Sequence, residues 1–293
     1  MTNKLMADNV TSNLFKKTEQ LFKSQNMLSS GKRINKPSDD PVGIGQVLDY
    51  RNTISSIDQY TRNISHGESQ LNLTDSTLGD VENSILRAKD LALSQATATA
   101  SQESRKITAE EVKTIYDQVL QLANTKLGNN YIFAGHKTDT APFSRDGNYD
   151  ATYNGHSGDI KIIIGENLDI SINANGDDVF SSGVKIFDVL MDLKNGLENN
   201  DTAAISAQIE LFDNALDQVL TARAETGSKL NRLETTKNYW ADFKVNVEQM
   251  LSDTENADII KVITDLQSQE NAYQASLSSA ARIIQPSLMD FLR

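Results

Sequence analysis

Three histidines are the first residues of this sequence that could bind a metal or move a proton. They are His66, His136 and His156, and they are scattered along the chain. No pair stands at the spacing that places two imidazoles on one face of a helix, as in an HExxH zinc site. We therefore expect structural or surface histidines here and no metal site.

The run from Asp146 through Asn148 to Asp150 resembles the first half of a calcium-binding loop. Such a loop needs a glycine at its sixth position and a glutamate at its end. Ala151 and Ser157 occupy those positions in this chain. The sequence therefore favours a solvent-exposed turn over a calcium site.

Nucleotide-binding and nucleophile motifs are also missing from the sequence. Gly43 and Gly45 lack the third glycine and the preceding strand of a dinucleotide fingerprint, and neither a Walker sequence nor a GxSxG elbow occurs. The absence of cysteine excludes disulfides, thiolate nucleophiles and cysteine metal ligands. We expect a structural protein with no enzyme activity, no cofactor and no metal.

The charge of the chain argues against nucleic acid or an anionic membrane as partner, because its formal net charge is −12. Residues 1–40 carry seven Lys and Arg against four Asp and Glu, and residues 252–293 carry three against six. The two ends are therefore of opposite sign. No stretch approaches the ~18 apolar residues of a membrane span. Residues 1–9 lack the apolar core of a cleaved secretory signal, so we expect either retention in the cell or export by another route.

Helices must make up most of this chain. Only 38% of its residues are hydrophobic, below the usual share of roughly 45–50%, which favours long helices with narrow apolar stripes. One seven-residue repeat, typical of a coiled-coil seam, consists of Ile57, Ile64, Leu71, Leu78, Ile85 and Ala92. The second row of positions that such a seam needs, beside this repeat on the same helix, is interrupted at Gly67 and Thr74.

Helix ends and strands can be placed from local signals. Gly31 is a predicted helix stop, and Asp40 followed by Pro41 predicts a helix start. Capping boxes are predicted at the pairs Thr108 with Glu111 and Ser252 with Glu255. Apolar residues alternate with polar ones over 168–172, and Ile160, Ile162 and Ile164 precede them at the same spacing, which predicts an antiparallel β region.

The predicted fold is mainly α with a small β insertion. We expect a long coiled-coil-like antiparallel helical rod, with paired terminal helices at one end and a small antiparallel β domain at the other. Residues 1–46 and 252–293 form the terminal helices in this scheme. Residues 47–129 and 184–251 form the helical rod, and residues 130–183 form a β-rich outer domain.

The terminal helices each carry one narrow apolar stripe on an otherwise polar surface. Two such helices alone bury little area, so the stripes favour an assembly interface over a private core, with ends that are disordered in the monomer. The predicted partner-binding residues are Leu14, Leu21, Leu28, Ile259, Ile263, Leu266, Tyr273, Leu277 and Ile284.

Three segments resemble a known family. Residues 28–43, LSSGKRINKPSDDPVG, resemble the N-terminal signature of the bacterial flagellin superfamily, and residues 275–293, ASLSSAARIIQPSLMDFLR, resemble its other characteristic end. Within that superfamily, residues 123–143, ANTKLGNNYIFAGHKTDTAPF, are similar to the hook-associated protein 3 type.

This resemblance implies a structural subunit that joins the flagellar hook to the flagellin filament. The implied partners are other copies of the chain in a ring, the other hook-filament junction protein, flagellin, and an export chaperone on the C-terminal helix. It also implies export without a cleaved signal peptide to an extracellular position in the flagellum. A filament-forming flagellin is the alternative, and a free helical adhesin or enzyme is a third hypothesis.

Overall fold

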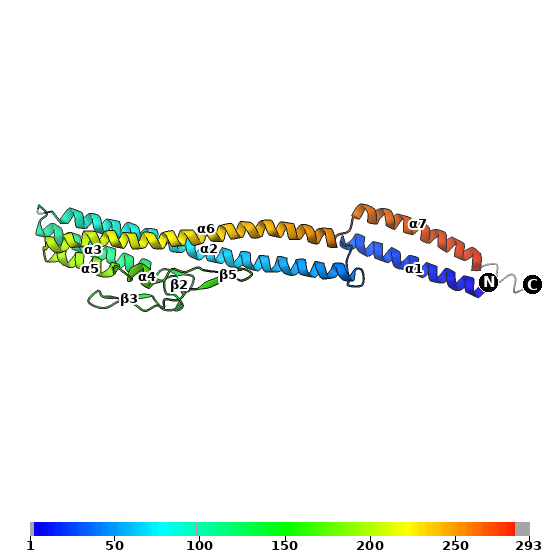
Figure 1. Ribbon diagram of the computed structural model, residues 1–293, viewed down its shortest axis with the longest axis horizontal. Helices are drawn as coiled ribbons and strands as arrows, with labels where there is room; N and C mark the ends of the chain where they lie inside the picture. Colours follow the sequence, from blue (N-terminus) through cyan, green and yellow to red (C-terminus); the bar gives the residue numbers. More distant parts are fainter. Residues whose placement is uncertain (1–2, 98, 285–293) are drawn as a thin grey trace, which may run out of the picture. The chain divides into compact units, whose positions relative to one another are not determined.

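Two helices of more than fifty residues dominate the computed structural model, which describes residues 3–97 and 99–284 (Figure 1). They are α2 (Pro41–Gln95) and α6 (Thr202–Glu255). The other helices are α1 (Asn3–Ser30), α3 (Gln102–Ala123), α4 (Gly176–Phe180), α5 (Ile186–Glu198) and α7 (Ile259–Ile284). The break between α5 and α6 falls at residues 199–201.

Short antiparallel strand pairs lie between α3 and α4. The strands are β1 (Lys126–Leu127), β2 (Asn130–Tyr131), β3 (Phe143–Arg145), β4 (Ala151–Tyr153), β5 (Lys161–Gly165) and β6 (Leu168–Ser171). Neighbouring strands pair as β1–β2, β3–β4 and β5–β6. The predicted fold class, mainly α with a small antiparallel β insertion, is thereby confirmed.

The chain forms two compact units. Unit 1 comprises Met1–Ser56 with Asp242–Arg293, and unit 2 comprises Ile57–Ala241. Both long helices continue from one unit into the other, and the β region belongs to the same unit as the helices that flank it. The three-part division expected from the sequence is not tested by this result and stays a prediction.

The seven-residue repeat of α2 forms the core of unit 2, as predicted. All six of its members are buried, with Leu71 and Leu78 fully enclosed. The interruption at Gly67 has a structural reason. A Cβ atom at Gly67 would lie 2.7 Å from Cδ1 of Ile162 and 2.9 Å from Cγ2 of Ile172. The glycine therefore leaves room for the β5–β6 hairpin to lie directly against the helix.

The β region shares its core with the helices. Trp240 of α6 donates its indole N–H to the carbonyl oxygen of Ile164 at 2.7 Å, and the Asn63 amide donates to that of Ile163 at 2.7 Å. Phe133 and Phe143 are buried in the same cluster as Tyr116 of α3. The apolar side chains of the strands are thus part of the packing of unit 2.

The start of α2 is as predicted. The Asp40 carboxylate accepts the backbone N–H of Gly43 at 2.9 Å, and Pro41 is the first helical residue. Gly31 ends α1 with φ of +70°, the left-handed conformation that glycine adopts without strain.

Both predicted capping boxes are wrong. Helix α3 begins earlier, at Gln102, because Ser101 accepts the backbone N–H of Ser104, and Thr108 bonds to the Ser104 carbonyl inside the helix. At the other site α6 continues through Ser252 to Glu255. Asp258 caps α7 instead, since its carboxylate accepts the N–H of Lys261 at 3.1 Å. In each case a side chain able to cap sits nearer to the real helix start.

Candidate assembly surface

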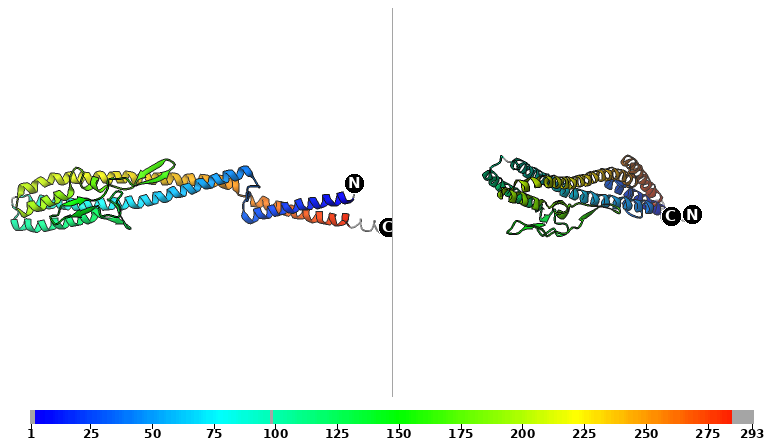
Figure 2. Two further views of the ribbon diagram at one scale, coloured as in Figure 1. Left: turned by 90° about the horizontal axis from the view of Figure 1, so that it is seen from below. Right: turned by 60° about the vertical axis from the view of Figure 1, so that its left-hand side comes forward.

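Helices α1 and α7 lie side by side in unit 1 and run in opposite directions (Figures 1 and 2). The carbonyl oxygen of Gly31, just after α1, accepts the N–H of Ala257, just before α7. Further into the pair the Ser24 hydroxyl, within the last two turns of α1, donates to the Gln269 side-chain oxygen at 3.0 Å. Leu14 and Ala280 line the same shallow hollow further along.

The seam between the two helices follows a heptad pattern of alternating four- and three-residue steps. Its buried and half-buried positions are Val10, Leu14, Lys17, Leu21, Ser24 and Leu28 on α1, and Val262, Leu266, Gln269, Tyr273, Ser276 and Ala280 on α7. Only Ser24, Val262 and Ala280 of these are below a tenth exposed. Small and polar side chains therefore occupy much of the seam.

The predicted partner-binding residues divide into two groups. Leu14, Leu21, Leu28, Leu266 and Tyr273 are half-buried at seam positions. Exposed positions on α7 are taken by Ile259, Ile263 and Leu277. Ile284 ends α7, and its side chain lies outside the described residues. The structure thus places the predicted stripe partly in the seam and partly on the outer surface of the pair.

The largest outward apolar side chains were not among the predicted residues. Phe15 is 72% exposed and Phe22 is 60% exposed, seven residues apart on α1, and Ile260 of α7 is 80% exposed. A spacing of seven places two side chains on one helical face, so the repeat of Phe15 and Phe22 was a signal that sequence reasoning could have used. The pair therefore has a mostly half-buried seam of leucine, polar and small side chains, and it exposes Phe15, Phe22 and Ile260 on its outer surface.

Acidic residues of the segment between α1 and α2 serve as structural caps. The pKa of Asp40 is lowered by the hydrogen bond from the Gly43 N–H, an effect that partial burial opposes and the Arg33 guanidinium reinforces. The pKa of Asp39 is lowered as well. Burial alone would raise this pKa, but the hydrogen bonds from the N–H groups of Asn35 and Lys36 have the larger combined effect. Both carboxylates are held charged by bonds within unit 1.

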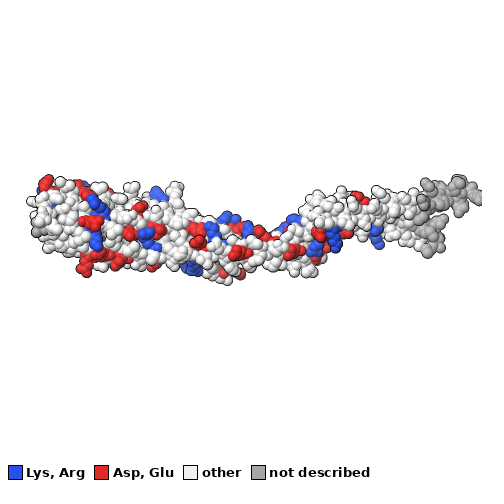
Figure 3. All heavy atoms as spheres, turned by 90° about the horizontal axis from the view of Figure 1, so that it is seen from above, with Lys and Arg blue, Asp and Glu red and all other residues white. Residues whose placement is uncertain are grey.

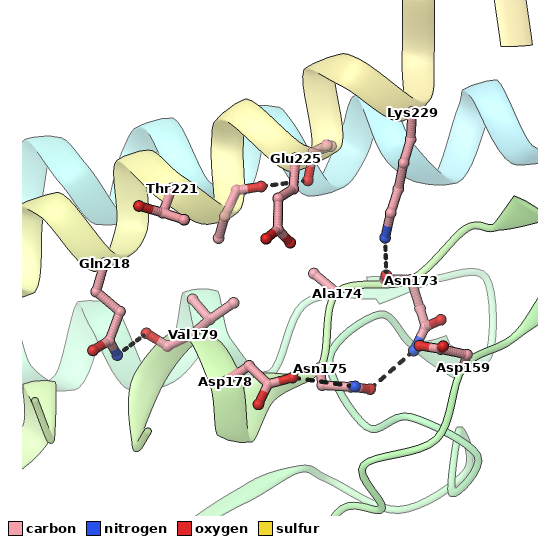
Figure 4. A pocket seen from close by; sticks show the side chains of 12 residues that line it. Asp159, Asn173, Ala174, Asn175, Asp178, Val179, Gln218, Thr221, Glu225 and Lys229 are labelled. Carbon is pink, nitrogen blue, oxygen red and sulfur yellow. Dashed lines mark hydrogen bonds between the residues drawn. The ribbon is translucent and has the colours of Figure 1, made fainter. Parts of the chain in front are cut away.

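A polar pocket of about 290 Å³ lies in unit 2, away from the terminal helices (Figure 4). Several of its polar side chains are bonded to the chain itself: Lys229 donates to the Asn173 carbonyl at 3.1 Å, and Gln218 donates to the Val179 carbonyl at 2.8 Å. Asn175 donates to Asp178, three residues further along the same segment. These bonds hold the β6–α4 loop against α6, a structural role.

The metal-site candidates are placed as follows. The rings of His136 and His156 stack with centroids 5.2 Å apart. The Asp146 carboxylate accepts the backbone N–H groups of Asn148 and Asp150, which makes the segment a self-bonded turn. Within residues 3–97 and 99–284, no group of three His, Cys, Asp or Glu side chains could hold a metal ion.

The surface shows no single-sign patch on the face drawn in Figure 3, where acidic and basic side chains are interspersed. Among the helices of the described chain, none combines the length and apolar content needed to cross a bilayer.

Comparison with known proteins adds to this picture. Residues 2–138 match the bacterial flagellin N-terminal helical region. The chain is 30% identical over 274 residues to flagellar hook-associated protein 3 of Escherichia coli strain K12, a match that covers 85% of this chain and 86% of that protein. It is 28% identical over 303 residues to the protein of the same name from Salmonella typhimurium, with 94% of each chain covered.

A solved structure has the same fold. Flagellar hook-associated protein 3 from Legionella pneumophila superposes with a TM-score of 0.65 at 18% identity, and the match covers 71% of this chain and 98% of that one.

These features define a structural protein of the bacterial flagellin class. They are the paired terminal helices, the long central helices, the β insertion and the matched N-terminal region. Its relatives are structural components of the flagellum. The chain belongs to the flagellar hook-associated protein 3 family.

Proposed function

We propose that this chain is the subunit that joins the flagellar hook, through the other junction protein, to the flagellin filament. The outward surface of the α1–α7 pair carries the proposal: Phe15, Phe22 and Ile260 are each at least 60% exposed, and most side chains of the seam are only half-buried. Exposed apolar area of this kind on soluble proteins marks contact surfaces. Copies of the chain in a ring and the neighbouring flagellar proteins are the partners that family membership suggests.

The assembly residues of this proposal are the nine predicted positions together with Phe15, Phe22 and Ile260. The seam group, which includes Leu14 and Leu266, holds the pair together. The outward group, which includes Ile263 and Leu277, faces the neighbours. The chain acts outside the cell without catalysis, and before assembly an export chaperone covers its C-terminal helix.

Filament-forming flagellin is the second candidate, because the matched N-terminal region is that of flagellins. Two relatives that cover most of the chain carry the hook-associated protein 3 name, which favours the junction role. Seeded polymerisation separates the two. A flagellin extends a seed into long filaments visible by electron microscopy, and a junction subunit does not.

Deletion of the gene tests the junction role directly. Cells that lack the subunit should make hooks, bear no filaments and release flagellin into the medium, and the gene supplied on a plasmid should restore filaments. Filaments of normal number on the deletion strain would refute the proposal.

The assembly surface is tested by Phe22→Ser, which replaces an exposed aromatic ring with a small polar group. We expect an unchanged melting temperature, because the ring is exposed, and a loss of filaments in the complemented strain. Ile107→Ser is the matched control, since Ile107 is 67% exposed on α3 of unit 2. Equal filament numbers for the two variants would remove Phe22 from the contact surface.

A further inference from the structure

The segment after α1 and the segment between α6 and α7 are bonded to each other in unit 1. Arg33 donates its backbone N–H to the carbonyl of Glu255 at 2.7 Å, and Lys32 forms an isolated antiparallel bridge with Asn256. Ala257 bonds back to Gly31. The two backbone segments that lead into the α1–α7 pair are therefore hydrogen-bonded to each other where the pair begins.

The side chain of Glu255 lies at the centre of this joint. It is 6% exposed, and its Oε1 atom lies 2.7 Å from Lys32 Nζ and 2.5 Å from Arg51 Nη2. Lys32 follows α1, Arg51 belongs to α2, and Glu255 ends α6. One carboxylate thus connects the end of α6 with two segments from the opposite end of the sequence.

A glutamate in this position needs both cations. The C-terminal end of a helix disfavours negative charge, and a buried charge that loses its partner is strongly destabilising. Glu255 is the last residue of α6 and is buried. Its carboxylate is therefore satisfied only in the arrangement that brings Lys32 and Arg51 to it.

Neighbouring contacts leave the joint little freedom. The Arg33 guanidinium donates to the Thr254 carbonyl at 2.7 Å and to Asp40 at 3.3 Å, and Asp40 caps α2. Ile34 is 2% exposed beneath this loop. A Cβ atom at Gly43 would lie 2.6 Å from Cδ1 of Ile34, so the backbone itself is closely packed.

We propose that Glu255, together with Lys32 and Arg51, is the positioning cluster that fixes the direction in which the α1–α7 pair leaves the adjoining ends of α2 and α6. The cluster sets the orientation of the pair, and contacts within the pair set its stability. In assembly, the cluster would aim the outward surface of the pair at the neighbouring subunits. This consequence rests on the proposed function.

Spin labels on the full-length chain test the positioning role, and the absence of cysteine makes labelling specific. Labels at Ser12→Cys and Asn246→Cys, both at exposed positions of unit 1, report the direction of the pair relative to the end of α6. Labels at Ser12→Cys and Ser278→Cys report the pair itself. Pulsed electron paramagnetic resonance should give one narrow distance distribution for each pair of labels in the parent.

Glu255→Gln removes the charge while it keeps the shape of the side chain. We expect it to broaden the 12–246 distribution and to leave the 12–278 distribution narrow, and Lys32→Gln and Arg51→Gln should each broaden the first distance too. Glu248→Gln is the matched control, because Glu248 is an exposed α6 residue that lies 3.8 Å from Lys244. This control should change neither distance.

Two results would overturn the inference. A 12–246 distribution that stays narrow in Glu255→Gln would show that the cluster does not orient the pair. Broadening of both distances would show that it only stabilises the two helices.

Assembly is measured separately in the deletion strain. Glu255→Gln should be exported like the parent and lose most filaments, whereas Glu248→Gln should restore them. Full filament numbers with Glu255→Gln would refute the consequence for assembly. If the parent gene itself restored no filaments, the proposed function would fall and the spectroscopic result would stand.

Discussion

Alanine at Gly67 should act very differently from alanine at Gly79, although both glycines lie inside α2. Replacement of glycine by alanine in a helix interior stabilises it by about 1 kcal/mol. At Gly79 the nearest atom to an added Cβ is Cζ of Arg223 at 3.7 Å, an ordinary contact. Gly79→Ala should therefore stabilise unit 2 by about 1 kcal/mol.

At Gly67 the added Cβ meets Ile162 at 2.7 Å and Ile172 at 2.9 Å, well inside the ~3.5–4.0 Å of a good carbon contact. Overpacking of a core typically costs about 1–3 kcal/mol. Gly67→Ala shares the helical gain of Gly79→Ala, so the difference between the two variants isolates this cost. We expect Gly67→Ala to be the less stable by about 1–3 kcal/mol.

Urea unfolding measures this difference with two signals. Helical circular dichroism follows the helices, and the fluorescence of Trp240, the single tryptophan of the chain, follows the docked β5–β6 hairpin. Gly67→Ala should lower the midpoint of the fluorescence transition at least as much as that of the helical signal. Equal midpoints for Gly67→Ala and Gly79→Ala would refute the docking of the hairpin against Gly67.

Three further predictions concern the core, the pH dependence and the chain ends. Leu71→Asp, which places a charge at a fully buried position, should cost about 4 kcal/mol or more, and a helical signal and melting temperature like those of the parent would contradict it. Burial raises the pKa of Tyr116 to about 12, so the unfolded chain loses this proton first and stability should fall between about pH 10 and 12. The stability of Tyr116→Phe, measured by urea titration, should fall less steeply over that pH range. In the free subunit, hydrogen exchange should be faster over residues 1–40 and 255–293 than from Ile57 to Ala92, because the α1–α7 seam is mostly half-buried, and equal protection of the ends and the Ile57–Ala92 stripe would favour a private core.

Regular patterns in the sequence predicted the regular parts of the fold. The heptad from Ile57 to Ala92 depends on one helix burying one stripe, so periodicity alone located it. The start of α2 was predictable because Asp40 and Pro41 act within one turn. The starts of α3 and α7 were missed because several side chains nearby could cap, and local sequence does not choose among them.

Features that depend on contacts between residues far apart in the sequence could not be predicted from the sequence. Gly67 interrupts a stripe, and only the position of Ile162 and Ile172 explains it. Glu255 was interpreted as part of a helix start, because Lys32 and Arg51 lie at the other end of the chain. The division of the terminal stripes into seam and outer surface likewise depends on how the two helices face each other.

The Ser24–Gln269 hydrogen bond makes the alignment of α1 with α7 unique. Two heptad helices can slide past each other by seven residues and still match most apolar positions, and a single polar layer in the seam is a known way to prevent it. A slip by one heptad would place Gln269 opposite Lys17 or beyond the end of α1, and Ser24 opposite Val262 or Ser276, so the Ser24–Gln269 hydrogen bond would be lost. Each terminal pair therefore has one alignment that keeps this hydrogen bond, so identical subunits can present identical outer surfaces, as the proposed ring of copies requires.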